Sequence, residues 1–275
     1  MALAIALANH KGGTAKTTTC ASLGVALLEL GHHPILLVDC DPTGALSASF
    51  GVFPTPEEKT IYHAMLERGT SLKRIIRSLR HGLDLAPASR DLSAAELLLP
   101  QEAAGDVMLR QTLQPIREVY PFTLLDCPPN LGPLTINALT AADGVLIPLT
   151  PAYLSLNPLQ QLFDTIEAVR TRLNPTLQLW GLLLTQFNRN TLHAQEVEER
   201  LRALYPALLL PQVIGQSVRF QEAPAGAQTI LDYQPTHPGA RAYRDVAKEV
   251  IRRAQTHPTS LGQSTARRGQ SPKSR

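Results

Sequence analysis

Short apolar runs alternate with amphipathic helical stretches along most of this chain. The apolar runs cover residues 3–8, 34–38, 83–87, 122–125, 144–149, 177–187 and 208–214. Between them, apolar residues recur at helical spacing over residues 16–30, 91–99, 157–173, 192–204 and 239–254. Near-continuous apolar strands that alternate with helices are typical of a parallel sheet covered on both faces. The pattern therefore predicts one α/β domain over residues 1–254, with a doubly wound, mainly parallel sheet flanked by helices.

The composition fits this prediction and narrows the class of protein. With 275 residues, 44% of them hydrophobic, the chain can bury one large core. No apolar run is long enough to span a membrane, and the apolar residues 1–8 lack the basic start of a signal peptide. The three cysteines, which have no metal-type spacing, suit a reducing compartment. We therefore expect a cytoplasmic protein.

Basic residues are concentrated in two segments. Residues 252–275 hold six Lys or Arg and no acid, so that residues 255–275 are predicted to form a disordered basic tail. Residues 71–80 predict an amphipathic helix with Ile75, Ile76 and Leu79 inward and four cations outward: Lys73, Arg74, Arg77 and Arg80. Both segments could contact the phosphates of a polyanion, and both could equally serve solubility alone.

A glycine-containing loop, residues 9–18, lies between the first predicted strand and the first predicted helix. In this setting, backbone N–H groups and a helix N-terminus can bind phosphates. His10 and Ala15 occupy the two glycine positions of the strict phosphate-loop pattern G-x-x-x-x-G-K-[ST]. The adjacent glycines 12 and 13 still allow close backbone approach, Lys16 can pair with the β- and γ-phosphates, and Thr17 can bind Mg²⁺. The segment alone leaves an ordinary strand-to-helix turn as the alternative.

Three acidic residues follow two other predicted strands. Asp39 and Asp41 come after residues 34–38, and Asp126 comes after residues 122–125. Open α/β sheets bind ligands at the carboxyl ends of their strands. Nucleotide hydrolysis needs acidic groups there, both for a metal shell and to orient the attacking water. One such acid is usually a cap or turn residue, but three of them beside a lysine-bearing loop predict a nucleotide-hydrolysing site.

Together these segments resemble the ParA/Soj family of P-loop ATPases, whose deviant Walker A loop carries an additional lysine at the position of Lys11. The resemblance continues through residues 39–42, 126–132, 137–139, 142–148, 218–224 and 239–243, and covers about residues 1–253. It implies binding of ATP or ADP with Mg²⁺, slow ATP hydrolysis and an ATP-bound sandwich homodimer.

The resemblance also implies roles for individual residues. In such a dimer Lys11 reaches the partner's phosphates, Lys16 binds phosphate, and Asp41 positions or activates the water. The metal shell would come from Thr17, Asp39 and Asp126, and Asn188 would read adenine. The nucleotide-binding run would be Lys11, Gly12, Gly13, Thr14, Ala15, Lys16, Thr17 and Thr18.

Three positions depart from the family pattern. Ala15 replaces the usual glycine, and a negative φ would accommodate its methyl group without strain. Thr43 stands where glutamine is usual, and Gly215-Gln216 stands where Pro-Arg is common. Each of these departures affects a role that the family resemblance implies for its segment.

The resemblance further implies partners: non-specific DNA contacted by Arg189 and Arg219, a ParB-type protein that stimulates hydrolysis, and association with the nucleoid. One alternative is a MinD-like membrane-positioning ATPase, which ends in an amphipathic membrane helix. Here, instead, the apolar stripe of residues 242–251 should pack on the sheet. The other alternative is a metabolic P-loop enzyme, such as an amidoligase or a reductase component, which would need a substrate pocket or cluster cysteines.

Overall fold

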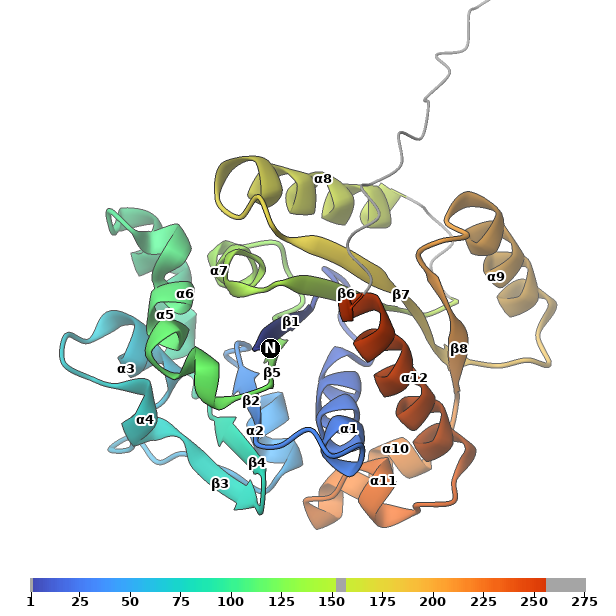
Figure 1. Ribbon diagram of the computed structural model, residues 1–275, viewed down its shortest axis with the longest axis horizontal. Coiled ribbons are helices and arrows are strands. Elements are labelled where there is room, and N and C mark those ends of the chain that lie inside the picture. Colours follow the sequence, from blue (N-terminus) through green and yellow to red (C-terminus); the bar gives the residue numbers. More distant parts are fainter. Residues whose placement is uncertain (1, 152–156, 256–275) are drawn as a thin grey trace, which may run out of the picture.

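The computed structural model describes residues 2–151 and 157–255, with only the backbone at residues 157 and 158. One eight-stranded sheet runs in the order β3-β4-β2-β5-β1-β6-β7-β8 (Figure 1). Only β3 is antiparallel to its neighbour, so the predicted mainly parallel, doubly wound sheet is confirmed. The strands are β1 (Leu3–Leu7), β2 (Ile35–Asp39), β3 (Arg77–Arg80), β4 (Leu83–Ala86), β5 (Phe122–Asp126), β6 (Gly144–Leu149), β7 (Gln178–Phe187) and β8 (Leu209–Gly215).

Helices cover both faces of the sheet. One face carries α1 (Lys16–Glu29), α2 (Ala45–Ser49), α10 (Arg219–Glu222), α11 (Ile230–Tyr233) and α12 (Pro238–Gln255). The other carries α3 (Ile61–Leu66), α4 (Leu72–Ile75), α5 (Leu92–Leu98), α6 (Met108–Leu113), α7 (Pro133–Ala141), α8 (Asn157–Arg172) and α9 (Leu192–Leu204). Short 3₁₀ helices are η1 (Leu99–Gln101), η2 (Gly105–Val107), η3 (Gln114–Val119) and η4 (Ala223–Gly226).

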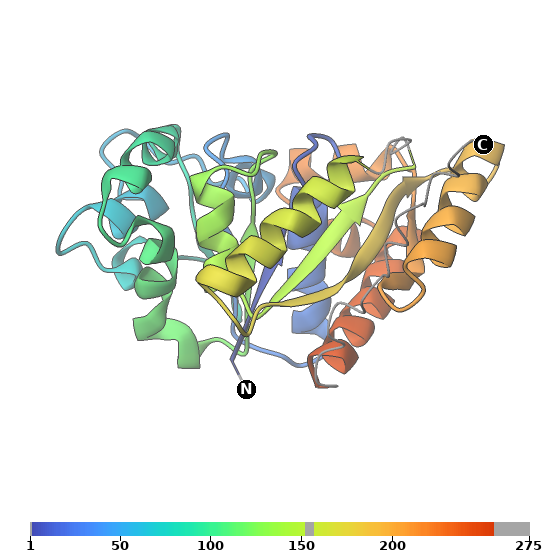
Figure 2. The ribbon, with the colours of Figure 1, turned by 90° about the horizontal axis from the view of Figure 1, so that it is seen from above.

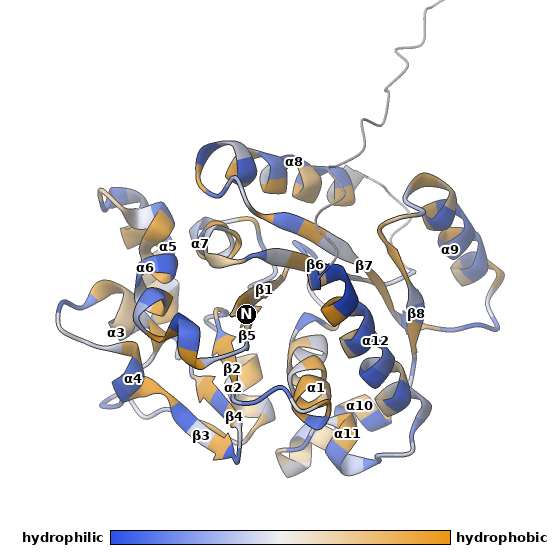
Figure 3. Cartoon of the chain, in the orientation of Figure 1, coloured by the Kyte–Doolittle hydropathy of each residue, from blue (hydrophilic) through white to orange (hydrophobic). Residues whose placement is uncertain are grey.

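The side-chain alternation of the strands divides the core into two clusters. In β1, Ile5 and Leu7 point to the α1 face, while Ala6 points to the opposite face. Helices α1 and α12 lie side by side on this face, and α12 also packs directly against β7 and β8; Figure 3 shows the mainly hydrophobic colour of α1 beside the polar outer side of α12. The predicted stripe of α12 packs there as expected, with Tyr243 and Val246 fully buried. In the described part of the chain, none of the helices combines the length and apolar character that crossing a membrane requires.

The helix predicted over residues 71–80 is wrong. Only Leu72–Ile75 is helical, and Arg77–Arg80 forms edge strand β3 beside β4. The chain leaves the helix because Ile76 is extended, and Gly82, at φ 78°, closes a hairpin that gives β4 a hydrogen-bonded neighbour. The predicted row of outward cations does not form, since Arg77 pairs with Glu58 at 2.7 Å and Arg80 with Asp232 at 2.5 Å.

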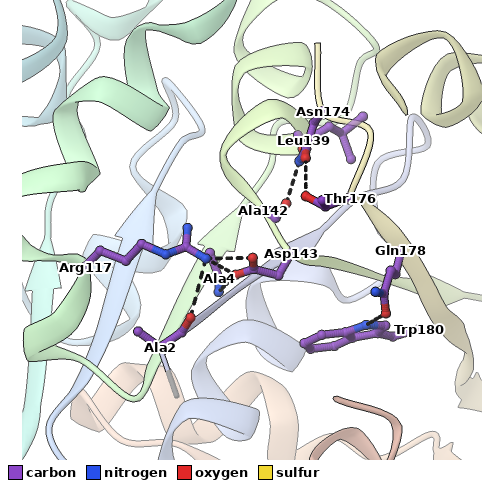
Figure 4. A network of polar contacts seen from close by, with 10 residues as sticks. All are labelled: Ala2, Ala4, Arg117, Leu139, Ala142, Asp143, Asn174, Thr176, Gln178 and Trp180. Atoms are coloured by element: carbon purple, nitrogen blue, oxygen red, sulfur yellow. Dashed lines mark hydrogen bonds and ion pairs between the residues drawn. The ribbon is translucent and has the colours of Figure 1, made fainter. Parts of the chain in front are cut away.

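A polar network fixes the amino-terminal ends of the central strands (Figure 4). The Asp143 carboxylate accepts hydrogen bonds from Ala4 N at 2.7 Å and from Arg117 at 2.6 and 2.7 Å. Next to it, the Trp180 indole lies against the backbone of Gly144, where a Cβ atom would approach the ring to 2.2 Å. Only glycine fits at residue 144, and the indole packs where the pairing of β6 with β7 shifts by one residue, between Leu179 and Gly181.

We predict that Gly144→Ala destabilises the fold by about 1–3 kcal/mol, because the rigid indole cannot move away from the new methyl group. Urea unfolding should show a lower midpoint. Gly226→Ala is the matched control, since the nearest atom to the place its Cβ would take is a flexible glutamine oxygen at 3.5 Å. Equal midpoints for Gly144→Ala and the unaltered chain would contradict the packing argument.

Candidate functional site

The loops that carry the predicted chemistry meet at one edge of the sheet. Strands β2, β5 and β1 are neighbours, with Asp39 in register with Asp126. Their carboxyl ends lie at the edge opposite the N-terminus (Figure 2). A cavity of about 370 Å³ opens there, called the main cavity below. It is lined by residues 12–18, Asp41, Pro129, Gln186, residues 214–217, Phe220, Gln221 and Tyr243.

The phosphate loop presents unpaired donors to this cavity. Among the described residues, the backbone N–H groups of Thr14 and Ala15 have no hydrogen-bond acceptor. Lys16 Nζ donates to the carbonyl of Lys11 at 3.3 Å, and Thr14 Oγ1 donates to the same carbonyl at 3.3 Å. Burial lowers the pKa of Lys16, while the carboxylate of Asp126 opposes this shift. Backbone N–H groups beside a lysine and a helix N-terminus form a site for phosphate oxygens.

The conformation of Ala15 differs from the one that its side chain prefers. Its φ is 61° and its ψ is 31°, in the left-handed region, and Gly13 has φ 72°. The negative φ that would have relieved Ala15 is therefore not adopted. A left-handed alanine costs about 1–2 kcal/mol, so the loop holds this backbone shape against the local preference.

Asp126 and Thr17 form the candidate metal site. Thr17 Oγ1 donates to Asp126 Oδ2 at 2.7 Å, and Asp126 Oδ1 is buried without a hydrogen-bond partner. Burial, reinforced by the nearby charge of Asp39, raises the pKa of Asp126. Mg²⁺ takes oxygen ligands and often binds carboxylates through its own water shell. A buried carboxylate oxygen without a partner, beside a threonine hydroxyl, fits such an ion.

Asp39 has a different environment. Its Oδ1 accepts the N–H of Asp41 at 3.2 Å, and its Oδ2 accepts both the N–H and the hydroxyl of Ser47, at 2.8 and 2.7 Å. Burial raises the pKa of Asp39 to about 6, against the effect of these hydrogen bonds. Both oxygens are thus engaged, and Asp39 ties the loop after β2 to helix α2.

Asp41 lies at the wall of the main cavity. Its Oδ1 accepts the N–H of Thr43 at 2.9 Å and the Thr43 hydroxyl at 2.8 Å. The residue at position 43, which differs from the family pattern, therefore orients this carboxylate. The carboxylate is held at the cavity wall with its direction set by the loop.

Two predicted residues lie outside the main cavity. Lys11 is exposed and lines an adjoining hollow of about 310 Å³, called the Lys11 hollow below, together with Asn188 and Gln186. Asn188 Oδ1 accepts the N–H of Asn190 at 3.0 Å. The structure thus separates Asn188 from Thr17 and Thr18, which line the main cavity.

Sequence reasoning missed the far wall of the main cavity. Gln216 and Ser217, which follow β8, and Phe220, in α10, line the same cavity as the phosphate loop. The unusual Gly215-Gln216 pair marked this segment, but nothing in the local pattern placed it beside residues two hundred positions earlier. Tyr243 closes the same wall and its hydroxyl contacts Thr19 at 3.1 Å.

The two predicted DNA-contacting arginines are exposed. Arg189 follows β7 and Arg219 begins α10 after β8, so both lie near the carboxyl ends of neighbouring strands. Arg219 pairs with Glu222 at 2.6 Å, and this hydrogen bond raises the pKa of Arg219. The predicted basic tail, residues 255–275, lies outside the described residues except for Gln255.

Comparison with known proteins agrees with this architecture. A family model described as an AAA domain matches residues 2–179. The chromosome-partitioning ATPase Soj of Thermus thermophilus is 43% identical over 251 residues, or 91% of this chain and 96% of that protein. The chromosome partitioning protein ParA of Caulobacter vibrioides is 39% identical, covering 90% and 94%. A solved structure of cobyrinic acid a,c-diamide synthase from Mycobacterium smegmatis, with bound ADP and magnesium, has TM-score 0.82 and 33% identity, covering 94% and 99%.

We predict that Ala15→Gly raises the free energy of unfolding by about 0.5–1 kcal/mol, because the relief of left-handed strain exceeds the added flexibility of the unfolded chain. Urea unfolding without nucleotide measures this change. Ala168→Gly, at an exposed position in the interior of helix α8, is the control and should change stability by about 0.5–1 kcal/mol in the opposite direction. A loss of stability in Ala15→Gly would contradict the strain argument.

Proposed function

The chain belongs to the ParA/Soj family of P-loop ATPases, and from this premise we propose that it is a nucleotide-switched dimer that binds DNA and partitions a replicon. It is an ATPase, which binds ATP and ADP together with Mg²⁺ and hydrolyses the ATP. The observation that carries the proposal is the meeting, at one cavity, of the phosphate loop, Asp41 and the unpaired oxygen of Asp126. These are the groups that phosphoryl transfer requires.

Each group has a role that follows from its position. The N–H groups of Thr14 and Ala15, with Lys16, bind phosphate oxygens. Thr17 and Asp126 would hold the shell of a magnesium ion, which would supply positive charge to offset the negative charge of the phosphates. Asp41, oriented by Thr43, positions the water that attacks the γ-phosphate. Asp39 links this loop to α2, so that the loop can report whether the γ-phosphate is present.

Lys11 supports a dimeric active state. Lys11 lines the Lys11 hollow and is not among the residues that line the main cavity, although glycines 12 and 13 line both. A lysine placed outside its own phosphate site can reach the phosphates of a second copy, where its charge stabilises the transition state. ATP would then join two chains, and hydrolysis would release them.

The base of the nucleotide fits the far wall of the main cavity. Phe220 and Ile214 supply apolar surface there, while Gln216 and Ser217 supply polar groups. We place the adenine at this wall, in preference to the predicted contact with Asn188, because that residue lies in the other hollow.

DNA binding is proposed for the edge that carries Arg189 and Arg219. Both side chains are exposed, and two apolar residues beside them, Leu192 and Val218, are 77% and 64% exposed. Joining two copies would double the number of cations available to phosphates without any reading of sequence. A ParB-type partner would stimulate hydrolysis and end this DNA-bound, nucleoid-associated state.

Amide synthesis is the second candidate, because one similar structure carries the name of a cobyrinic acid a,c-diamide synthase at 33% identity. It would require a substrate carboxylate beside the γ-phosphate and consumption of an amide donor. Partition is preferred because the relatives named as partition ATPases are 39% and 43% identical over at least 90% of this chain.

We predict that ATP with Mg²⁺ converts the chain to a dimer that binds a non-specific DNA duplex, while ADP does not. Asp41→Ala should prolong the dimeric state by slowing hydrolysis at least about tenfold. Light scattering gives the mass, and anisotropy of labelled DNA gives binding. A dimer that ignores DNA in every nucleotide state would exclude partition; lipid vesicles, and then cobyrinic acid with glutamine, would be the next ligands.

We predict that Arg189→Ala and Arg219→Ala each weaken DNA binding equally across sequences. Each should also reduce the salt slope of log K by about 1 for every DNA phosphate that the complex no longer neutralises. Glu222→Gln is the matched control: it leaves Arg219 in place but removes its anionic partner, so DNA affinity should rise. DNA affinity that falls in Glu222→Gln, or stays unchanged in both arginine variants, would remove this surface from the proposal.

A further inference from the structure

The phosphate loop is held from the side by the end of strand β7. Gln186 Nε2 donates to the carbonyl of Gly13 at 2.9 Å. The hydroxyl of Thr185, which is fully buried, lies 3.1 Å from the carbonyl of Thr14 and 3.0 Å from that of Leu149, and shares its proton between them. Two successive residues of β7 thus contact two successive carbonyls of the loop.

Peptide geometry converts these contacts into a direction for the N–H groups. In a trans peptide the C=O of one residue and the N–H of the next lie in one plane and point in opposite directions within it. The carbonyls of Gly13 and Thr14 are held toward β7, so the N–H groups of Thr14 and Ala15 point away from it. These two N–H groups are among the loop donors at the main cavity that have no hydrogen-bond acceptor within the described residues.

The backbone of Gln186 shows that this contact is maintained against local preference. Its φ is 50°, a left-handed value that is rare for a residue with a side chain. Gln186 lines both the main cavity and the Lys11 hollow, so it lies between the two spaces on either side of the loop. Strain of this kind persists where surrounding contacts over-determine it and is concentrated at functional sites.

We propose that Thr185 and Gln186 are positioning residues for nucleotide binding: they fix the peptide planes 13–14 and 14–15 so that both N–H groups face the phosphates before nucleotide arrives. The inference rests on ATP binding at this loop. A loop that is already oriented binds its ligand without an ordering cost, so the clamp acts on affinity for ATP and ADP alike.

The test is titration of each variant with a ribose-labelled fluorescent ATP analogue and with ADP, in the presence of Mg²⁺. Gln186→Met keeps the length of the side chain but cannot donate, and its Kd should rise about 3- to 10-fold for both nucleotides. Thr185→Val should raise the Kd by a similar factor. Thr185→Ser keeps the hydroxyl, so it should bind both nucleotides as tightly as the unaltered chain. Melting without nucleotide should place Gln186→Met within a few degrees of the unaltered chain, because Gln186 is exposed.

Two further measurements separate the effect of orienting the loop N–H groups from the effect of backbone strain at Gln186. Gln186→Gly removes both the donor and the left-handed strain, and it should still bind weakly; Ala227→Gly relieves a similar φ of 54° away from the loop and should bind normally. In a ¹⁵N-labelled chain, the Thr14 amide should shift in Gln186→Met before nucleotide is added.

Folded variants of Gln186 and Thr185 that bind ATP and ADP as tightly as the unaltered chain would overturn the clamp while leaving ATP binding intact. An unaltered chain that binds neither nucleotide would instead refute the ATP site itself, and the clamp with it. Weak binding by Gln186→Met and Gln186→Gly, with normal binding by Thr185→Ser and Ala227→Gly, supports the clamp.

Discussion

The site depends on one partly buried hydrogen bond, from the Thr17 hydroxyl to the Asp126 carboxylate at 2.7 Å. It joins the first turn of α1 to the end of β5, and so fixes where the phosphate loop stands relative to the acidic loops. Only one oxygen of Asp126 is used, and the other is buried without a partner. A buried carboxylate in this state is costly unless a cation shell or a proton satisfies it. The unpartnered oxygen of Asp126 therefore lowers the stability of the fold without metal, and a magnesium ion bound there would offset this cost.

The loops around this bond are held in shapes that their residues do not prefer. Ala15 and Gln186 both adopt positive φ, one on each side of the clamped carbonyls. Such strain is compatible with a stable fold because it is local, while the sheet beneath is covered by one apolar cluster on each face. The rigid sheet supplies the frame, and the strained loops supply the directed N–H groups.

The two acidic residues of the loop after β2, Asp39 and Asp41, have different roles. Both carboxylate oxygens of Asp39 accept hydrogen bonds, one from the loop and one from α2. The carboxylate of Asp41 lies at the cavity wall, where it accepts a hydrogen bond from the N–H of Thr43. A change in the position of Asp41 would therefore be transmitted through Asp39 to α2. This link is a short chain of hydrogen bonds, which is the kind of connection through which a γ-phosphate can alter a distant surface.

The sequence by itself determined the seven parallel strands and the phosphate loop, because apolar periodicity and the order of loop residues are local properties of the chain. It also singled out Asp39, Asp41 and Asp126 as candidates, and the structure places Asp39 and Asp126 at the ends of the neighbouring strands β2 and β5 and Asp41 just after β2. It failed at residues 71–80, where the basic segment reads as a helix but the hairpin with β4 provides hydrogen bonds that only the edge of a formed sheet can offer. Tertiary structure alone decided that both oxygens of Asp39 accept hydrogen bonds and that Ala15 is left-handed. It also decided that Gln186 contacts the loop and that Phe220 and Tyr243 line the same cavity. These facts depend on strands β7 and β8 and helix α12 lying beside residues about two hundred positions earlier, and no local pattern encodes contacts at that separation.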